Sequence, residues 1–176
     1  MLQVADGDLA AFDSLVRRHE QTAWRVAYRM LGDPAEAEDA AQQAFLKIFE
    51  AAPRYEPTAA FTTYLYRVLT RHCLDRIEKK KPVYVDKLPP CRDRQKGPQA
   101  HLEARQRGHQ IRRALEQLPG RQRTAVILFH FEGLSYVEIA DSLQCSKKAV
   151  ERLLARGRSA LAEELESLMP VNAKTG

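Results

Sequence analysis

The chain has 176 residues, of which 44% are hydrophobic and 29% are charged, and this length and composition suit one globular domain or two small ones. It contains no apolar run near the roughly 20 residues that span a bilayer. Its first residues, MLQVADGDLAAF, are acidic where a signal peptide is basic and apolar. These features argue against a disordered, membrane-inserted or exported protein, and we expect a cytoplasmic location.

Motifs for metal or cofactor chemistry are missing. Cys73, Cys91 and Cys145 lie far apart without CxxC spacing, which argues against a zinc site or a disulfide framework. The five histidines show no ligand spacing, and the chain has no GxGxxG, P-loop or HExxH motif. We therefore expect no metal, no cofactor and no catalytic residues. We interpret the cysteines as incidental, with redox sensing as the alternative.

The positive charge is concentrated in the middle of the chain. The formal net charge is +5, but residues 1–60 have a net charge of −4, residues 61–96 of +6 and residues 97–134 of +3. A basic block indicates a polyanionic partner, and the acidic start in front of it needs a separate explanation.

The first sixty residues predict two helices and a loop. Apolar residues recur at steps of three and four from Leu9 to Leu31, and Gly32 ends this helix. The sequence Asp33-Pro34-Ala35-Glu36 then supplies an N-cap, a proline for the first helical position and a glutamate that can reach back to the cap. The helix that follows continues to about Glu50, and two prolines bracket a loop over residues 53–60.

This second helix begins with the acidic residues Glu36, Glu38 and Asp39. A solvated first turn, favoured by the helix dipole, explains them best. Metal-binding or general acid–base carboxylates are a weaker alternative, and a protein–protein surface is another that the sequence leaves open.

A third helix is predicted from Phe61 to Lys81, stopped by Pro82. Its basic residues are Arg67, Arg71, Arg76, Lys79, Lys80 and Lys81. Cations near a helix C-terminus are favoured by the dipole alone. However, four aromatic residues, Tyr55, Phe61, Tyr64 and Tyr66, are interleaved with them, and unstacked bases bind by stacking on aromatic rings while cations follow the phosphates. We expect Phe61 in the core and favour Tyr64 as the stacking platform.

The rest of the chain predicts a linker followed by four helices. Residues 82–100 hold four prolines and no period, which indicates either a plain tether or a linker with its own binding surface. Helices are then predicted at about 102–118 and 121–131, followed by a short helix opened by a Ser135–Glu138 capping box and a long one capped by Ser146. We expect an all-α chain with domains at 1–81 and 101–176.

Residues 134–158 have the layout of a helix-turn-helix, with three residues, Gln144-Cys145-Ser146, between its two helices. The second helix would place its first turns in the major groove, where Lys and Arg can take guanine edges or phosphates and Glu can accept from cytosine. The residues that project from this helix are Lys147, Lys148, Glu151, Arg152, Arg156 and Arg158. The alternative is an antiparallel helix pair with a solvated charged face.

Together these segments resemble the extracytoplasmic-function group of bacterial sigma factors, the small two-domain initiation factors of RNA polymerase. The resemblance rests on three stretches: AFDSLVRRHEQTAWRVAYRMLGDPAEAEDAAQQAFLKIFE, FTTYLYRVLTRHCLDRIEKKK and LEQLPGRQRTAVILFHFEGLSYVEIADSLQCSKKAVERLLARGRSAL. Their order and spacing, with the linker between them, make the resemblance specific over nearly the whole chain.

The resemblance implies a role for each stretch. The AEDAAQQAF segment matches the one that docks on the clamp helices of the polymerase largest subunit, which implies a core-binding set of Asp39, Gln42, Gln43, Phe45 and Lys47. The 53–60 loop and the helix after it match the part that flips a base of the minus-ten element. This implies a minus-ten set of Tyr55, Phe61, Tyr64, Arg67, Arg71, His72, Asp75, Arg76, Lys79 and Lys80.

The last helix would read the minus-thirty-five element, which implies a set of Arg121, Ser146, Lys147, Lys148, Glu151, Arg152, Arg156 and Arg158. The resemblance further implies that the partners are core RNA polymerase, including the flap of its second-largest subunit, promoter DNA and an anti-sigma factor. The alternatives are a stand-alone helix-turn-helix regulator, which would bind DNA without polymerase, and a helical nuclease or nucleotide-processing enzyme.

The chain also departs from the family pattern. Tyr64 stands where the family usually has Trp, and His72 stands where it usually has Asn. In the last helix Glu151 occupies a position that is commonly basic, so the minus-thirty-five preference does not transfer. Gly157 replaces a small helix former at a cost of up to about 1 kcal/mol relative to Ala, which predicts a weak point in that helix.

Overall fold

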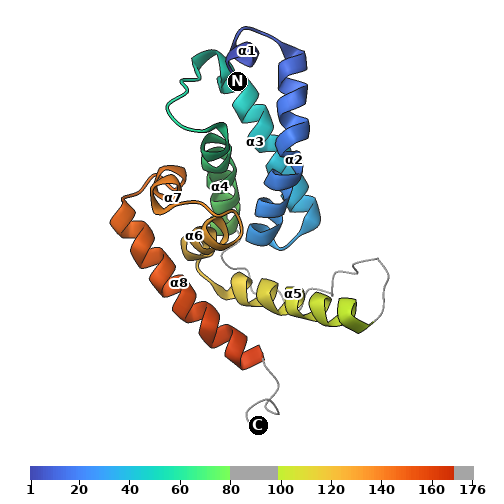
Figure 1. Ribbon diagram of the computed structural model, residues 1–176, viewed down its shortest axis with the longest axis vertical. Helices are drawn as coiled ribbons and strands as arrows, with labels where there is room; N and C mark the ends of the chain where they lie inside the picture. The colour runs from blue at the N-terminus through green and yellow to red at the C-terminus, as the bar shows by residue number, and fades with distance from the viewer. Residues whose placement is uncertain (80–98, 169–176) are drawn as a thin grey trace.

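The computed structural model describes residues 1–79 and 99–168, and all regular structure in these ranges is helical. Figure 1 shows the helices in two groups, with α2, α3 and α4 side by side and α8 running obliquely across the second group. The helices are α1 (Leu2–Ala5), α2 (Leu9–Leu31), α3 (Pro34–Ala51), the 3₁₀ turn η1 (Ala52–Arg54), α4 (Phe61–Lys79), α5 (Gln99–Gln117), α6 (Gly120–His130), α7 (Tyr136–Ser142) and α8 (Lys147–Leu168).

The boundaries of α2 and α3 follow from local chemistry. Gly32 ends α2 in the left-handed region at φ 78°, where a residue without Cβ carries no steric cost. The Asp33 side chain then accepts a hydrogen bond from the backbone N–H of Glu36 at 2.9 Å, and Pro34 occupies the first turn of α3. These predicted start and stop signals are confirmed.

The helix-turn-helix is confirmed at α7 and α8. Ser135 and Glu138 form a complete capping box at the start of α7. Gln144 adopts φ 48°, a left-handed conformation that turns the chain, and the Ser146 Oγ accepts from the backbone N–H of Ala149 at 3.2 Å. The turn thus fixes where α8 begins, so the first residues of α8 point outward.

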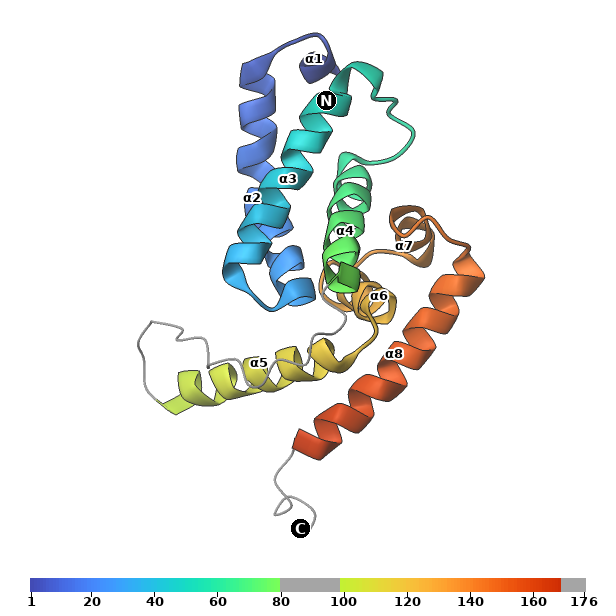
Figure 2. The same cartoon turned by 180° about the vertical axis from the view of Figure 1, so that it is seen from behind.

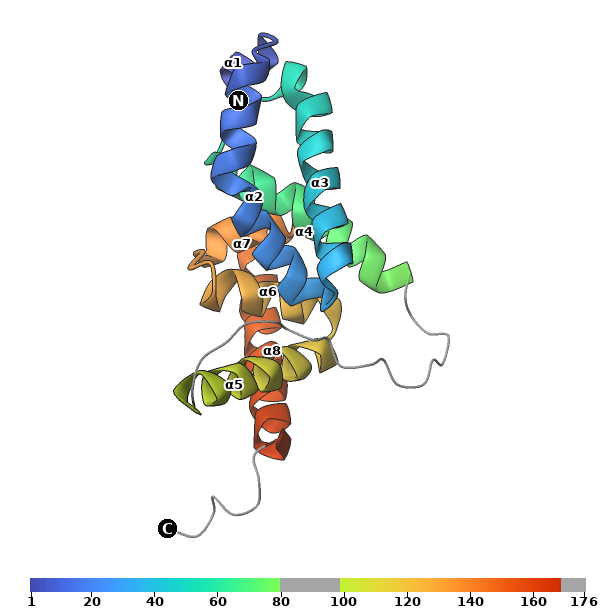
Figure 3. The same ribbon diagram turned by 90° about the vertical axis from the view of Figure 1, so that its right-hand side faces the viewer.

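The two groups of helices pack directly on each other. Buried side chains form one continuous cluster that includes Leu65 and Leu69 of α4 together with Ile127 and Leu128 of α6. Seen from behind, α4 lies between α3 and α7 (Figure 2), and a quarter turn shows α5 crossing α8 (Figure 3). The second half of the chain therefore sits against the helix that carries the predicted minus-ten residues.

Arg123 of α6 holds the junction together. Its side chain is buried, and its guanidinium donates hydrogen bonds to the carbonyl oxygens of Met30 at 2.6 Å and Leu118 at 3.2 Å, and to that of Glu116. The last carbonyl groups of a helix have no hydrogen-bond partner within the helix. The Arg123 side chain therefore donates the hydrogen bonds that the C-terminal carbonyl groups of both α2 and α5 would otherwise lack. Burial lowers the pKa of Arg123.

Some predictions differ from the structure in detail. The α1 and η1 segments were not expected, and η1 takes up the beginning of the predicted 53–60 loop. The α5 helix begins at Gln99, three residues before the predicted start. Lys80, Lys81, Cys91 and most of the predicted linker lie outside the described residues. Within residues 1–79 and 99–168, no helix is both long and apolar enough to cross a membrane.

Helix packing explains why residue 157 is a glycine, which helix propensity alone could not. It lies in α8 where that helix approaches α6 closely, and a Cβ added there would meet Cγ2 of Val126 at 2.8 Å. Val126 is itself fully buried and branched at Cβ, so it has little freedom to move aside. The absence of a side chain at Gly157 thus permits the contact between α6 and α8, and the residue is not simply a weak point.

We expect Gly157→Ala to lower the free energy of unfolding by about 1 kcal/mol, because the cost of overpacking exceeds the gain in helix propensity. Gly108→Ala is the matched control, since a Cβ at this position of α5 meets no atom within 4 Å. This control should leave stability unchanged or raise it. Urea unfolding followed by circular dichroism measures both, and a Gly157→Ala variant as stable as the Gly108→Ala variant would contradict the packing argument.

Candidate nucleic-acid interface

The start of α8 presents an exposed polar face. Val150 and Leu154 are fully buried and attach α8 to the core, and Leu153 packs against it, so the polar side chains between them project to solvent. All eight residues of the predicted set are exposed, and the six that lie between positions 146 and 156 are Ser146, Lys147, Lys148, Glu151, Arg152 and Arg156. This face combines four cations with one carboxylate, which suits contact with phosphates and with base edges.

The structure separates two predicted residues from this face. Arg121 donates from Nη2 to the carbonyl oxygen of Leu143 at 3.1 Å and thereby joins α6 to the end of α7. Arg158 donates from Nε to the carbonyl oxygen of Leu154 at 3.2 Å, and its guanidinium carbon lies 6.0 Å from the ring centroid of Phe129. Both guanidinium groups thus have partners within the protein.

A second candidate surface surrounds the loop between η1 and α4. An open cavity of about 580 Å³ is lined by Tyr55, Thr58, Tyr64 and Arg67, together with residues from the end of α3. The rings of Tyr55 and Tyr64 meet edge to face with centroids 5.2 Å apart. Burial raises the pKa of Tyr64, so its hydroxyl remains protonated and the ring is neutral. Two aromatic rings and a guanidinium beside a cavity are the groups that hold an unstacked base.

The remaining aromatic residues point elsewhere. Phe61 is partly buried and packs on the ring of His19 with centroids 5.0 Å apart, outside the lining of this cavity. Burial, followed by the charge of Arg18, lowers the pKa of His19. Tyr66 is buried and faces the second half of the chain. The preference for Tyr64 over Phe61 therefore agrees with where the two rings lie.

The far end of α4 has a mixture of exposed and paired residues. Arg71, Asp75 and Lys79 are exposed. Arg76 pairs with Asp39 of α3 and approaches the carbonyl oxygen of Glu36 at 3.5 Å. This pairing brings together a residue of the predicted minus-ten set and one of the predicted core-binding set.

His72 is half-buried on the same helix. Burial lowers its pKa, helped by the charges of Lys47 and Arg76. Its Nε2 atom is buried without a hydrogen-bond partner among the described residues. The remaining predicted residue, Lys80, lies outside the described residues.

A hydrophobic groove runs between α2 and α3. It has a volume of about 850 Å³ and is lined by Phe12, Trp24, Gln42, Phe45 and Leu46, among others. Leu46 is 52% exposed, which is unusual for a large apolar side chain on a packed helix. Of the predicted core-binding set, only Gln42 and Phe45 line this groove.

The other members of that set lie elsewhere. Lys47 lines the tyrosine-containing cavity, Asp39 pairs with Arg76, and Gln43 is half-buried. Sequence reasoning missed Trp24 and Leu46. The adjacent apolar pair Phe45-Leu46 could have signalled Leu46, because neighbouring residues on a helix cannot both face the same core.

Two acidic residues of the second half were also missed. Glu132, in the loop between α6 and α7, accepts a hydrogen bond from the Tyr66 hydroxyl at 3.1 Å and pairs with Nη1 of Arg29 at 3.2 Å. Asp141 of α7 pairs with Nη2 of Arg67 at 2.6 Å. Both carboxylates contact helices of the first half, and one of them engages a residue of the predicted minus-ten set.

Among the residues that the structure describes, no group of three or more His, Cys, Asp or Glu side chains could hold a metal ion. The Cys73 thiol is buried, and burial raises its pKa to about 12, so it is protonated and unreactive at neutral pH. This supports the incidental interpretation for Cys73.

Two family models match the chain, sigma-70 region 2 over residues 15–83 and sigma-70 region 4 over residues 108–161. The chain is 34% identical to the ECF RNA polymerase sigma factor SigE of Mycolicibacterium smegmatis, covering 92% of this chain and 65% of that protein. It is 31% identical to the ECF RNA polymerase sigma factor SigW of Bacillus subtilis, covering 94% of this chain and 95% of that protein.

Solved structures agree on the fold. CnrH in complex with the cytosolic domain of CnrY matches with a TM-score of 0.70 and 25% identity over 94% of both chains. RpoE of Bartonella quintana in complex with the anti-sigma factor NepR matches with a TM-score of 0.71 over 90% of this chain and 98% of that one; at 19% identity it shows the fold alone.

Two sigma-70 models match in order along one chain, and that chain covers nearly all of a relative 31% identical to it. The chain therefore belongs to the extracytoplasmic-function group of the sigma-70 family and is an RNA polymerase sigma factor of transcription initiation.

Proposed function

We propose that residues 1–81 bind core polymerase and the minus-ten element, that residues 101–176 bind the minus-thirty-five element, and that residues 82–100 link them. The observation that carries the proposal is the presence on one chain of two distinct surfaces whose residues suit contact with nucleic acid. One is the exposed cationic face at the start of α8, and the other is the cavity lined by Tyr55 and Tyr64. Two weak modules on one platform gain affinity from their high effective concentration.

At the minus-thirty-five element, α8 would insert its first turns into the major groove. Lys147 and Lys148 lie at the N-terminal end of the helix, and Glu151 and Arg152 lie one turn further on the same exposed face. The structure supports a smaller reading set than the sequence predicted, because Arg121 and Arg158 already bind backbone carbonyls of the protein.

At the minus-ten element, the cavity beside α4 would hold a base extruded from the duplex. Extrusion costs a few kcal/mol of unstacking, which stacking on an aromatic ring recovers in part. Tyr64 and Tyr55 supply the rings, and Arg67 supplies a cation for the adjoining phosphate. The exposed residues Arg71 and Lys79 extend the cationic surface along α4.

The groove between α2 and α3 would dock on the polymerase clamp helices. Its lining includes Phe45 and Trp24, and also Leu46, whose side chain is exposed. An apolar groove with a polar rim is the surface that an amphipathic helix covers. Since polymerase and chromosome share the bacterial cytoplasm, the proposal places the protein there. An anti-sigma partner fits the proposal too, because the similar protein CnrH was solved with the cytosolic domain of CnrY, and RpoE was solved with the anti-sigma factor NepR.

Run-off transcription with bacterial core polymerase tests the function as a whole. On a library of candidate promoters, we expect transcripts that require this protein and share a pair of upstream elements. A gel shift without core polymerase provides the contrast. Tight binding to a symmetric DNA site in the absence of core, together with no binding to core, would instead establish a stand-alone regulator.

We expect Arg152→Ala and Lys148→Ala to weaken holoenzyme binding to promoters that contain a minus-thirty-five element. A lost base contact costs about 1–3 kcal/mol and relaxes specificity, whereas a lost phosphate contact lowers the salt slope by about one. Filter binding over a series of salt concentrations separates the two effects. Arg113→Ala, which removes an exposed cation of α5, is the matched control. An equal loss in this control would refute the assignment to α8.

We expect Tyr64→Ala to impair promoter opening about tenfold while leaving closed-complex binding intact, because the lost stacking is worth about 1–3 kcal/mol per base. Permanganate reactivity of thymines in the bubble measures opening. Tyr64→Phe keeps the ring and should behave like the unchanged protein. Unaltered thymine reactivity in the Tyr64→Ala holoenzyme would rule out the stacking role.

A further inference from the structure

We propose that the cavity between α2 and α5 binds a small amphiphilic anion, a carboxylate that carries an apolar tail. The cavity has a volume of about 290 Å³, close to the lower end of the range for small-molecule sites. None of its lining residues belongs to the predicted DNA-binding or core-binding sets, so the inference is independent of those assignments. The lining residues are Arg25, Tyr28 and Arg29 of α2, Gly108, Ile111, Arg112 and Leu115 of α5, and Phe131 at the end of α6.

One wall of the cavity is apolar. The lining residues of α5 recur at steps of three, one and three, so they share one face of that helix. Ile111 is 37% exposed and Phe131 is 41% exposed, and these two large apolar side chains line the same cavity. Apolar side chains that face water in a concave surface favour a ligand with an apolar part, because the ligand removes them from water.

Gly108 keeps this wall open. It lies within α5, where glycine is a poorer helix former than alanine, and its φ is not in the left-handed region. A Cβ added at this position meets no atom within 4 Å, so helix packing does not require the glycine, in contrast to Gly157. What the missing side chain leaves is space in the cavity, which a larger residue would occupy.

Two arginines of the lining supply positive charge without a carboxylate partner. Arg25 and Arg112 take part in none of the ion pairs among the described residues. Arg25 donates to Oγ1 of Thr22 at 3.2 Å. Arg112 donates to the hydroxyl of Tyr28, lies 5.0 Å from the centroid of that ring and approaches Nδ1 of His109 at 3.5 Å. None of these partners is an acid, whereas a carboxylate can accept two parallel hydrogen bonds from one guanidinium.

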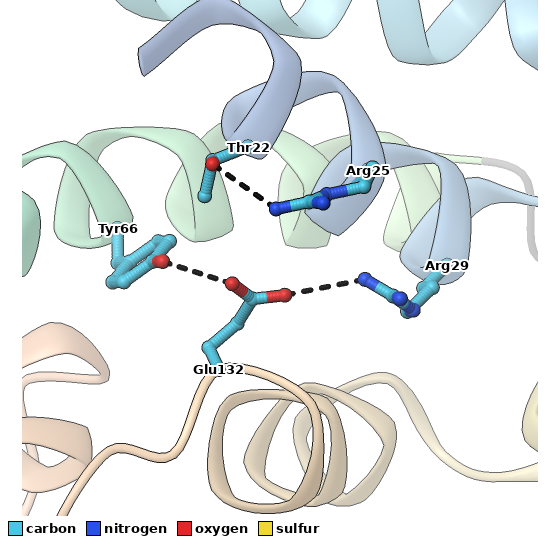
Figure 4. A network of polar contacts seen from close by, with 5 residues as sticks. All are labelled: Thr22, Arg25, Arg29, Tyr66 and Glu132. Atoms are coloured by element: carbon cyan, nitrogen blue, oxygen red, sulfur yellow. Dashed lines mark hydrogen bonds and ion pairs between the residues drawn. The ribbon is translucent and has the colours of Figure 1, made fainter. Parts of the chain in front are cut away.

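The third arginine of the lining is already compensated. Figure 4 shows Arg29 paired with Glu132, whereas Arg25 bonds to Thr22 instead. The guanidinium carbon of Arg29 also lies 4.5 Å from the ring centroid of Phe131. The charge available to a ligand is therefore that of Arg25 on α2 and that of Arg112 on α5.

The combination of groups defines the ligand class. Inorganic phosphate would satisfy the two cations and leave the apolar wall in water, and an alcohol with an alkyl chain would do the reverse. A carboxylate with an apolar tail uses both parts of the lining. Octanoate, octan-1-ol and inorganic phosphate are therefore the three probes that separate the contributions.

The chain contains its own reporter for this site. Trp24 is its single tryptophan, and the ring stacks on that of Tyr28 with centroids 5.0 Å apart and an interplanar angle of 15°. Tyr28 lines the cavity and binds Arg112, so a ligand that engages Arg112 changes the surroundings of the Trp24 ring. Tryptophan fluorescence of the full-length protein then follows binding, and isothermal titration calorimetry gives the dissociation constants.

We expect octanoate to bind saturably and at least tenfold more tightly than octan-1-ol, because charge-assisted hydrogen bonds contribute about tenfold or more to affinity. It should exceed inorganic phosphate by a similar factor, because phosphate buries no apolar surface. Equal affinity for octanoate and either of the other probes, or no saturable binding of octanoate, would overturn the proposal.

Variants place the ligand in this cavity. Arg112→Gln should weaken octanoate binding at least tenfold and leave the weak binding of octan-1-ol unchanged. Arg113→Gln is the matched control, since it removes the neighbouring exposed cation of α5, which does not line the cavity. Gly108→Leu fills the cavity and should abolish binding of octanoate, whereas Gly108→Ala should retain it. An equal loss in Arg113→Gln, or full binding by Gly108→Leu, would contradict the assignment.

Circular dichroism checks that each variant keeps its helix content. Arg25 is exposed and contacts only its own helix in Figure 4, so Arg25→Gln keeps the test decisive if a substitution on α5 disturbs folding. We expect Arg25→Gln to weaken octanoate binding at least tenfold as well. An unchanged affinity in this variant would overturn the carboxylate site between the two arginines.

Discussion

A single buried guanidinium, that of Arg123, is the constraint on which the arrangement of the two halves depends. It donates to carbonyls at the C-terminal ends of α2 and α5, which are otherwise left without partners where these helices stop. The Arg123 side chain belongs to α6, a helix buried on nearly all sides from Arg123 to Leu128. Its hydrogen bonds therefore fix α6 against α2. The position of α6 in turn determines where the following loop, α7 and α8 lie. Glu132 and the helix-turn-helix are placed beside α4 for this reason.

This placement decides which side chains of the two proposed DNA-binding surfaces are free. The cationic start of α8 projects to solvent, because Val150 and Leu154 direct its opposite face into the core. Arg67 of α4, by contrast, is held by Asp141. The same packing thus leaves one recognition surface open and partly occupies the other. The division could not be inferred from charge alone, since both helices have similar runs of basic residues.

Local signals in the sequence predicted the helices well. Asp33, Ser135 and Ser146 cap helices as expected, because capping depends on residues three positions apart. The contacts that join the two halves were missed. Tyr66 and Glu132 are 66 residues apart, Arg67 and Asp141 are 74 apart, and Arg123 and Met30 are 93 apart. No periodicity encodes such pairs. Gly157 is another case that the sequence could not predict. Helix propensity predicts that a glycine weakens α8, whereas the close approach of Val126 leaves no room for a side chain there.

The interface between the halves is mixed: Leu65 and Leu69 of α4 pack with Ile127 and Leu128 of α6, and two ion pairs also cross it. A buried ion pair adds little net stability compared with well-packed apolar side chains, but losing one partner is costly, so it specifies one arrangement without binding it tightly. The buried leucine and isoleucine side chains favour association through the hydrophobic effect, whereas the contacts of Glu132 and Asp141 fix which residues face each other. The polar contacts therefore give the packing of the two halves its specificity rather than its strength.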